Sequence, residues 1–180
     1  MEERVIVLKN LEVYTMKTLL IAALTTLLFA TSAPIAAHAA TPDDWAALQG
    51  VKSGKGIFDI NITDVEKLPL YLQVIKETND GLKKQGVKPD LIVVFRGGAV
   101  RFVSSSRARF SPEQKVSLGN ADALLQELVK RGVRFEACAV ATRLFKLDNA
   151  TIIPDVKVVG NTFISLIGYQ AKGYAIIPIQ

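Results

Sequence analysis

The pattern of hydrophobic and polar residues after residue 56 switches repeatedly between a strand period and a helix period. Residues 57–62 alternate apolar and polar side chains, which predicts a strand with one exposed face. Residues 90–95 form an almost continuous β-branched run, as expected of a central parallel strand that is covered on both faces. Further strands are predicted at 132–141, 156–159 and 173–179, and 142–150 is expected to be a short helix or loop.

Three helices are predicted between these strands. After a capping-box sequence at 63–66, the first makes a turn up to Leu68 and continues from Pro69, because a proline at the first helical position needs no N–H. The second begins at Ser111 and ends at Gly132, and the third covers 162–172. The side chains expected to face the core are Leu70, Val74, Ile75, Thr78 and Leu82 of the first helix, Val116, Ala121, Leu124, Leu125, Leu128 and Val129 of the second, and Phe163, Leu166, Ile167 and Ala171 of the third.

This order of elements indicates the fold class. Strands separated by helices are joined by right-handed crossovers, which make the strands parallel and place helices on the faces of the sheet. We therefore expect an α/β fold with three layers, α/β/α, and a mostly parallel sheet of about five strands. Pro178 in the last strand predicts a position at the edge or end of the sheet. A chain of 180 residues fits one such domain.

The N-terminal region has the features of a secretory signal. Lys17 precedes an apolar stretch at 19–33, and small residues follow it up to Ala39. We expect a signal peptide at 16–39, cleavage after Ala39 and export to the periplasm. The alternative is a membrane anchor, but the stretch is shorter than the about 20 residues of a spanning helix. We therefore expect no stable membrane anchor after cleavage.

The residues on either side of this signal carry two further expectations. Residues 1–15 contain three glutamates, which do not belong to the basic head of a signal peptide. We therefore expect Met16 to be the initiator and 1–15 to be a misannotated extension. Residues 40–55 mix polar, glycine and alanine residues around Trp45, which predicts a loosely ordered lead-in to a folded domain at 56–180.

Charge and composition exclude several classes of function. The formal net charge is +5, and removing 1–39 leaves it unchanged because three of the 22 Lys+Arg and three of the 17 Asp+Glu residues leave together. Basic charge without interleaved aromatic residues is weak evidence for nucleic acid, so no nucleic-acid partner is expected. His38, the single histidine, leaves with the signal. Its loss argues against a Ser-His-Asp hydrolase, a Cys–His pair and most zinc sites, and we expect no metal and no cofactor.

Cys138, the single cysteine, is the first candidate for chemistry. It lies near the carboxyl end of a predicted strand, where ligands collect in open α/β sheets. Thr142 and Arg143 follow it and offer a helix start and a cation, both of which favour the thiolate. Glu136 shares the strand face and would raise the thiol pKa if no arginine offsets it. The alternatives are a buried cysteine that packs as a small hydrophobe and a cysteine that forms an intermolecular disulfide.

A second candidate is the basic segment that follows residue 95. Its members are Arg96, Gly97, Gly98, Arg101, Ser104, Ser105, Ser106, Arg107 and Arg109. These residues suit an anion pocket at the end of a strand, because glycine lets backbone N–H groups approach a ligand. The segment lacks the motifs of phosphate-binding and dinucleotide-binding loops, so a solvated basic loop is the alternative.

Four segments, in this order, resemble the DsrE/DsrF-like proteins, including the branch called YchN-like. They are Leu91-Ile-Val-Val-Phe-Arg-Gly-Gly98, Leu124-Leu-Gln-Glu-Leu-Val-Lys-Arg-Gly-Val133, Phe135-Glu-Ala-Cys138 and Ile167-Gly-Tyr-Gln-Ala-Lys-Gly-Tyr-Ala-Ile176. The resemblance implies a small α/β sandwich that assembles into homo-oligomers or mixed trimers and hexamers. Better-known members pass sulfur as a cysteine persulfide, and Cys138 matches a family thiol position. Those relay members are cytoplasmic, whereas this chain has a predicted export signal.

Two functions therefore stay open from the sequence. In the first, an exported sulfur carrier accepts sulfane sulfur on Cys138 and passes it on, with Arg143, Arg96 and Gly97 as candidate stabilisers of the thiolate or of an anion. In the second, a non-catalytic oligomeric binding or scaffold protein keeps Cys138 in its core. The expected partners are further copies of the chain and, for the carrier, a sulfur donor or acceptor protein.

Overall fold

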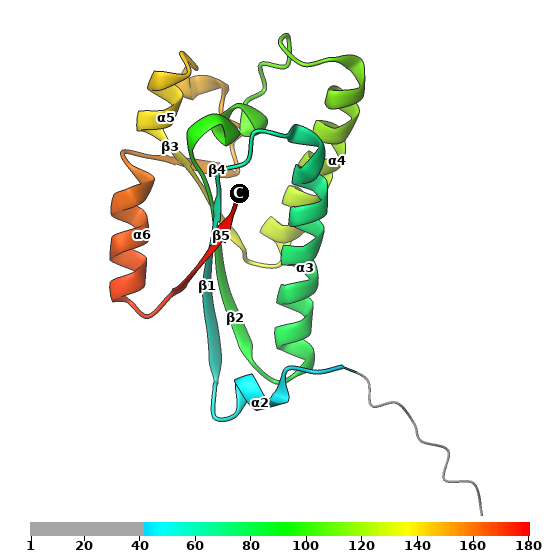
Figure 1. The fold of residues 1–180 in the computed structure, drawn as a ribbon, viewed down its shortest axis with the longest axis vertical. Coiled ribbons are helices and arrows are strands. Elements are labelled where there is room, and N and C mark those ends of the chain that lie inside the picture. Colours follow the sequence, from blue (N-terminus) through cyan, green and yellow to red (C-terminus); the bar gives the residue numbers. More distant parts are fainter. Residues whose placement is uncertain (1–41) are drawn as a thin grey trace, which may run out of the picture. The chain divides into compact units, whose positions relative to one another are not determined.

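The centre of the fold is a sheet of five parallel strands in the order β4-β3-β2-β1-β5 (Figure 1). The computed structural model describes residues 42–180. The strands are β1 (Ser53–Ile60), β2 (Lys88–Phe95), β3 (Arg134–Cys138), β4 (Val156–Val159) and β5 (Ala175–Ile179). The predicted α/β class is confirmed, and β5 lies at an edge, as its proline indicated.

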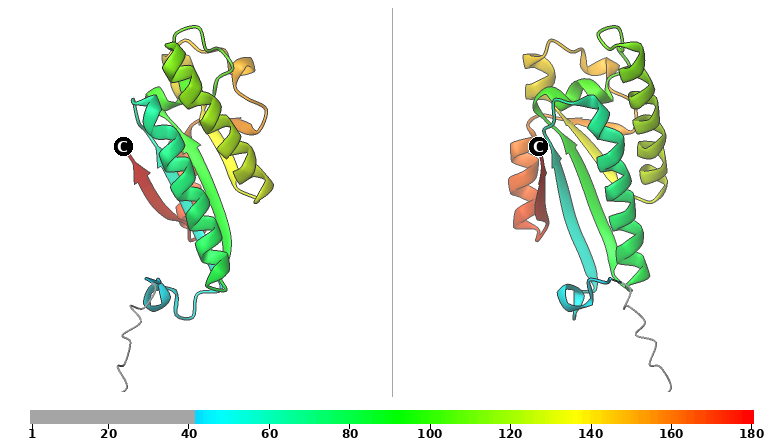
Figure 2. Two further views of the ribbon diagram at one scale, coloured as in Figure 1. Left: turned by 90° about the vertical axis from the view of Figure 1, so that its right-hand side faces the viewer. Right: turned by 45° about the vertical axis from the view of Figure 1, so that its right-hand side comes forward.

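Helices form the two outer layers. They are α2 (Trp45–Leu48), α3 (Leu68–Lys84), α4 (Pro112–Lys130), α5 (Ala139–Leu144) and α6 (Thr162–Ala171), with the 3₁₀ helices η1 (Val65–Lys67), η2 (Gly97–Val103) and η3 (Asn149–Thr151). Figure 2 shows α3 and α4 side by side on one face of the sheet and α6 on the opposite face. The short helix α5 follows β3 directly, at the carboxyl ends of the strands.

Strand β2 is apolar on both faces because both faces are covered. Leu91, Val93 and Phe95 belong to the hydrophobic cluster that includes the buried sides of α3 and α4. Ile92 and Val94 belong to the smaller cluster under α6. All five side chains are buried, which confirms the central position predicted from the continuous apolar run.

Local sequence explains where the long helices begin. The Ser111 hydroxyl oxygen accepts a hydrogen bond from the backbone N–H of Gln114, and the Gln114 side chain accepts one from the Ser111 N–H, each at 3.2 Å. This capping box confirms the predicted start of α4. Before α3, the cap is Asp64 and not Thr63 of the predicted capping box, because the Asp64 side chain accepts the N–H of Glu66 at 3.0 Å and starts η1. Pro69 lies in the first turn of α3, as predicted.

The long helices on the α3/α4 face do not bury all the residues predicted. In α3, Leu70 and Val74 are exposed, and the buried residues are Leu68, Leu72, Ile75 and Asn79. The prediction is confirmed for Ile75, which is fully buried, and Leu82 packs against the core, so only Leu70 and Val74 of the five predicted residues face solvent. In α4, Val116 in the first part of the helix is also exposed.

Helix α6 buries less of its surface than predicted. Phe163, Ile167 and Ala171 were expected to face inward but are exposed, and only Thr162 and Leu166 are buried. The reason is geometric, because α6 covers its face of the sheet without a neighbouring long helix and contacts it along one narrow side.

Three segments differ in extent from the predicted elements. Strand β3 ends at Cys138 and α5 starts at Ala139, so the strand predicted at 132–141 is too long. Residues 97–103 form η2, a largely buried 3₁₀ helix that the hydrophobic pattern did not reveal. Within the predicted loose lead-in, α2 forms and β1 already begins at Ser53.

Two predictions concern residues that precede residue 42. The predicted extension at 1–15 and the predicted signal peptide at 16–39 lie outside the described residues. Between residues 42 and 180, no helix combines the length and hydrophobicity that crossing a membrane requires.

Candidate functional site

Cys138 is the last residue of β3, at the carboxyl edge of the sheet. Its side chain is only 5% exposed, but it lines a pocket of about 230 Å³. The other walls include Arg96 and Gly97 after β2, Leu144 of α5, and Asn161, Thr162 and Phe163 at the start of α6. The thiol is therefore buried beside a space that a small molecule can occupy.

Parallel pairing brings the start of α6 to this thiol. Cys138 of β3 is paired with Val159 of β4, so the two strands end side by side. Two residues later Asn161 caps α6, because its side-chain oxygen accepts the backbone N–H of Phe163 at 2.9 Å. The first N–H groups of a helix have no partner within the helix. One of them, from Thr162, is available to the sulfur.

Hydrogen bonds set the acidity of Cys138. Burial raises the pKa of this thiol. Hydrogen bonds from the hydroxyl and the backbone N–H of Thr162 lower the pKa, as do those from the backbone N–H groups of Ala141 and Val140. Together they hold the pKa below its ordinary value, because each donor favours the charged form. Since the thiolate is the nucleophile, the site favours the reactive form of cysteine despite its burial.

Glu136 does not act on the thiol as the sequence suggested. The carboxylate was expected to raise the pKa of Cys138 if no arginine offset it. The pKa is instead lowered, because the hydrogen bonds that lower it outweigh the burial that raises it. Glu136 is 6% exposed, and its Oε1 accepts a hydrogen bond from the Tyr169 hydroxyl at 2.9 Å. It lines two hollows beside α6 and is not among the residues that line the thiol pocket.

Two of the three candidate stabilisers lie in the wall of the pocket. Arg96 Nε donates to Asp59 Oδ1 at 2.7 Å, and the guanidinium carbon lies 5.5 Å from the ring centroid of Phe163. Because Asp59 is buried against it, the charge of Arg96 is compensated within the protein. Arg143 is exposed and is not a lining residue of the pocket.

Gly97 is required by the backbone at this wall. Its φ of 53° lies in the left-handed region that residues with a side chain rarely adopt. A Cβ built at Gly97 would collide with the side-chain oxygen of Asn61, which follows β1. A side chain at this position would therefore adopt an unfavourable φ and require the Asn61 side chain to shift.

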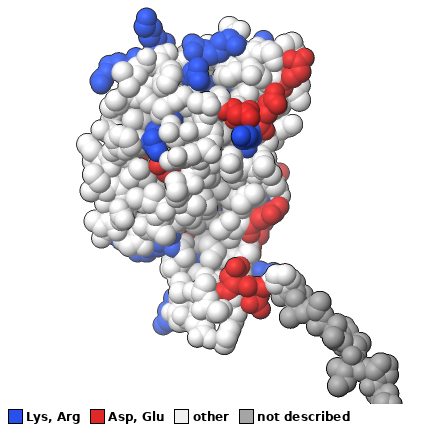
Figure 3. Space-filling model, viewed as in Figure 1, with Lys and Arg blue, Asp and Glu red and all other residues white. Residues whose placement is uncertain are grey.

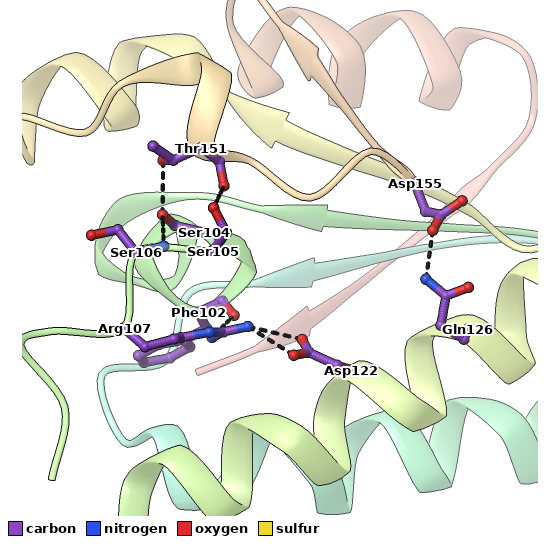
Figure 4. Close-up of polar contacts among 9 residues, drawn as sticks. All are labelled: Phe102, Ser104, Ser105, Ser106, Arg107, Asp122, Gln126, Thr151 and Asp155. Carbon is purple, nitrogen blue, oxygen red and sulfur yellow. Dashed lines mark hydrogen bonds and ion pairs between the residues drawn. The ribbon is translucent and has the colours of Figure 1, made fainter.

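The arginines of the basic segment bind groups of the protein itself. Figure 4 shows Arg107, whose Nη2 donates to both carboxylate oxygens of Asp122 at 2.9 and 3.0 Å and whose Nη1 donates to the Phe102 carbonyl at 2.7 Å. Arg101 Nε donates to the carbonyl of Gly98 at 3.0 Å. These contacts direct the guanidinium groups of Arg101 and Arg107 to separate partners within the protein.

The three serines are also structural. The hydroxyls of Ser104 and Thr151 lie 2.8 Å apart, and the Ser105 hydroxyl donates to the Thr151 carbonyl at 3.0 Å (Figure 4). The backbone N–H of Ser106 donates to the Ser104 hydroxyl oxygen at 3.1 Å. These hydrogen bonds connect the segment after η2 to η3. The serines are therefore held by the rest of the protein, unlike the residues of a solvated loop. Arg109 is exposed.

Charge and exposed apolar area are distributed unevenly around the site. In Figure 3, Lys and Arg side chains gather at the end where α5 lies, whereas the surface over α6 is largely uncharged. Exposed large apolar residues here are Leu144, Phe163, Ile164 and Ile167, with Ile167 69% exposed and Leu144 71% exposed. The pocket therefore opens on an apolar surface.

Sequence reasoning missed Thr162 and Asn161. The order of elements in the sequence could have revealed them. The neighbouring parallel strands β3 and β4 end at the same edge of the sheet, and α6 begins just after β4. An asparagine directly before a predicted helix is a typical cap. That combination places the first residue of α6 beside the last residue of β3.

Three comparisons place the chain among known proteins. An uncharacterized protein of Aquifex aeolicus (strain VF5) is 26% identical over 125 residues, which are 69% of this chain and 55% of that protein, so the chain spans about half the length of this relative. MTH1491 of Methanobacterium thermoautotrophicum, a protein of unknown function, has a solved structure with a TM-score of 0.56 and 20% identity over 71% of this chain and 100% of its own, which is a likeness of fold. The model of the DsrE/DsrF-like family matches residues 56–179. This match confirms the resemblance expected from the sequence, and the chain belongs to the DsrE/DsrF-like family.

Proposed function

We propose that the chain is an exported sulfur carrier of the periplasm, in which Cys138 accepts sulfane sulfur and passes it on as a persulfide. Family membership relates the chain to sulfur metabolism. The observation that carries the proposal is the thiol of Cys138, which borders a pocket and has a lowered pKa. Export rests on the signal-like sequence at 16–39.

The transfer is a displacement at sulfur. The Cys138 thiolate attacks the outer sulfur of a persulfide donor R–S–SH, a new S–S bond forms, and the S–S bond of the donor breaks. The donor leaves as R–S⁻ with the electron pair of the broken bond, and Cys138 carries S–SH with the donor's proton. The sulfane sulfur keeps its oxidation state. An acceptor thiolate then attacks that outer sulfur in the same way and releases the Cys138 thiolate.

The pocket suits a persulfide. One S–S bond extends the side chain by about 2 Å. The space of about 230 Å³ in front of Cys138 accommodates this extension. Leu144 and Phe163 supply apolar walls, and Arg96, held by Asp59, packs over the Phe163 ring. We assign Arg96 and Gly97 to shaping the pocket, and the hydrogen-bond donors around Thr162 to stabilising the thiolate. Arg143 has no assigned part in the transfer.

A non-catalytic oligomeric scaffold is the second candidate. The observation that favours it is the exposed apolar surface of α6, formed by Phe163, Ile164 and Ile167. Uncharged apolar patches of this kind are typical of protein contacts. We propose that this helix contacts further copies of the chain, and such an assembly is compatible with either function. The scaffold differs from the carrier in leaving Cys138 without sulfur chemistry.

Intact-protein mass spectrometry separates the two candidates. The mature protein is incubated with a small persulfide, separated from it and weighed without reductant. The carrier gains about 32 Da per added sulfur, the gain disappears on reduction, and Cys138→Ser never shows it. A second incubation with an acceptor thiol removes the added sulfur. An unchanged mass of the wild-type protein would favour the scaffold.

A further inference from the structure

Glu136 is a buried carboxylate that the thiol chemistry does not use. It lies in the middle of β3, is 6% exposed, and its Oε1 accepts the Tyr169 hydroxyl at 2.9 Å. No group of the described residues donates a hydrogen bond to its Oε2, although this atom is buried as well. A buried carboxylate oxygen without a donor is costly, which points to a ligand that supplies one.

Glu136 borders a hollow that carries opposite charges. A space of about 270 Å³ beside α6 is lined by Glu136, Lys157, Lys172, Ser165 and Tyr169, among others. Lys157 of β4 is the register partner of Glu136. No ion pair of Lys157 or Lys172 occurs within residues 42–180. The residues that line this hollow therefore supply one carboxylate and two ammonium groups without a carboxylate partner, and the Lys172 ammonium lies 5.7 Å from the ring centroid of Tyr169.

This combination selects a class of ligand. A metal cation would meet two lysines, and the described part of the chain has no group of three or more His, Cys, Asp or Glu that could hold one. A simple anion would suit the lysines but would meet the carboxylate of Glu136. A small molecule with an ammonium and a carboxylate group satisfies both sides, because charged hydrogen bonds are the strong ones.

We propose that this hollow binds the head group of an α-amino acid. The ammonium group of the ligand donates to Oε2 of Glu136, and its carboxylate faces Lys157 and Lys172. Tyr169 is a positioning residue, since its hydroxyl occupies Oε1 and leaves Oε2 for the ligand. The site is separate from the thiol pocket, which has no lining residue in common with it.

The test is a titration of the isotopically labelled protein with L-alanine, followed by amide chemical shifts. We expect shifts centred on Ser165, Gly168 and Lys157, with the amides of Val140 and Ala141 unchanged. L-alaninamide lacks the carboxylate and N-acetyl-L-alanine lacks the ammonium. Each should bind at least about tenfold more weakly, because a charged hydrogen bond is lost. No shift up to the solubility limit of L-alanine, or equal binding of either analogue, would overturn the proposal.

Variants locate the site independently of the analogues. Glu136→Gln keeps the size of the side chain and should weaken L-alanine binding about tenfold, since the ammonium loses its charged acceptor. Lys157→Met, on an exposed side chain, tests the other end and should also weaken binding. Glu66→Gln and Lys115→Met change exposed charges elsewhere and should leave it unaltered. Unchanged binding to Glu136→Gln, with a native amide spectrum, would contradict the assignment.

Discussion

The hydroxyl of Thr162 hydrogen bonds to the sulfur of Cys138 and so joins the first turn of α6 to the end of β3. Thr162 is itself almost fully buried, which holds this donor in place. The contact connects two segments that are more than twenty residues apart in the chain. The acidity of the thiol therefore depends on the position of α6. Substituting Thr162 tests this contact directly.

Replacing Thr162 with valine should raise the pKa of the Cys138 thiol. Valine keeps the shape of threonine but removes the hydroxyl that favours the thiolate. We expect the rate of alkylation at neutral pH to fall severalfold, while the rate well above the pKa changes little. Thr162→Ser should restore the wild-type rate. Thr78→Val, which removes a hydroxyl bonded to the Val74 carbonyl on α3, is the matched control. An unchanged pH profile in Thr162→Val would contradict this role.

The lowered pKa of Cys138 predicts a specific dependence of stability on pH. Folding favours the thiolate, so its contribution to the free energy of unfolding is fully present above the unfolded thiol pKa of about 8.5. It is lost as the pH falls through the lower folded-state pKa. The difference in unfolding free energy between wild type and Cys138→Ser should therefore rise with pH across that window. Urea unfolding at a series of pH values measures it, and a constant difference would speak against the shift.

The sequence predicted the layers of this fold better than the surroundings of the thiol. Several signals are local and can be read without knowledge of the tertiary structure. They are the strand and helix periods, the capping box at Ser111 and the proline in β5. The donors at Thr162 arise from pairing between β3 and β4, which is a long-range property. Arg107 was unpredictable for the same reason, since its partner Asp122 lies on the next helix.

The ion pair of Asp59 and Arg96 should contribute to stability because it is largely buried. Asp59→Asn keeps the shape but leaves Arg96 without a compensating charge beside the pocket. We expect a loss of about 2 kcal/mol in the free energy of unfolding, in the range of charge-assisted hydrogen bonds. Asp64→Asn, which breaks the exposed 3.9 Å pair with Lys67, should cost less than about 1 kcal/mol. Equal losses in urea unfolding would show that burial of the first pair is unimportant.

Gly97→Ala should destabilise the wall of the pocket by more than a conformational penalty. Alanine is disfavoured at positive φ by roughly 1–2 kcal/mol, and at Gly97 its Cβ also collides with Asn61. Gly86→Ala has a similar φ of 79° but no neighbour within 4 Å of the added Cβ, so it reports the conformational part alone. Adding Asn61→Ala to Gly97→Ala should recover part of the loss. Equal thermal stability of Gly97→Ala and Gly86→Ala would refute the collision.

The central claim is that the pocket gives small molecules access to the Cys138 thiol in the folded protein. The most direct measurement is the rate of alkylation by iodoacetamide in increasing urea below the unfolding transition. Access through the pocket predicts labelling of the native protein at a rate that stays constant as urea increases. A rate that rises steeply with urea, or labelling only after unfolding, would mean that the thiol is reached by opening the fold, and it would contradict the carrier function.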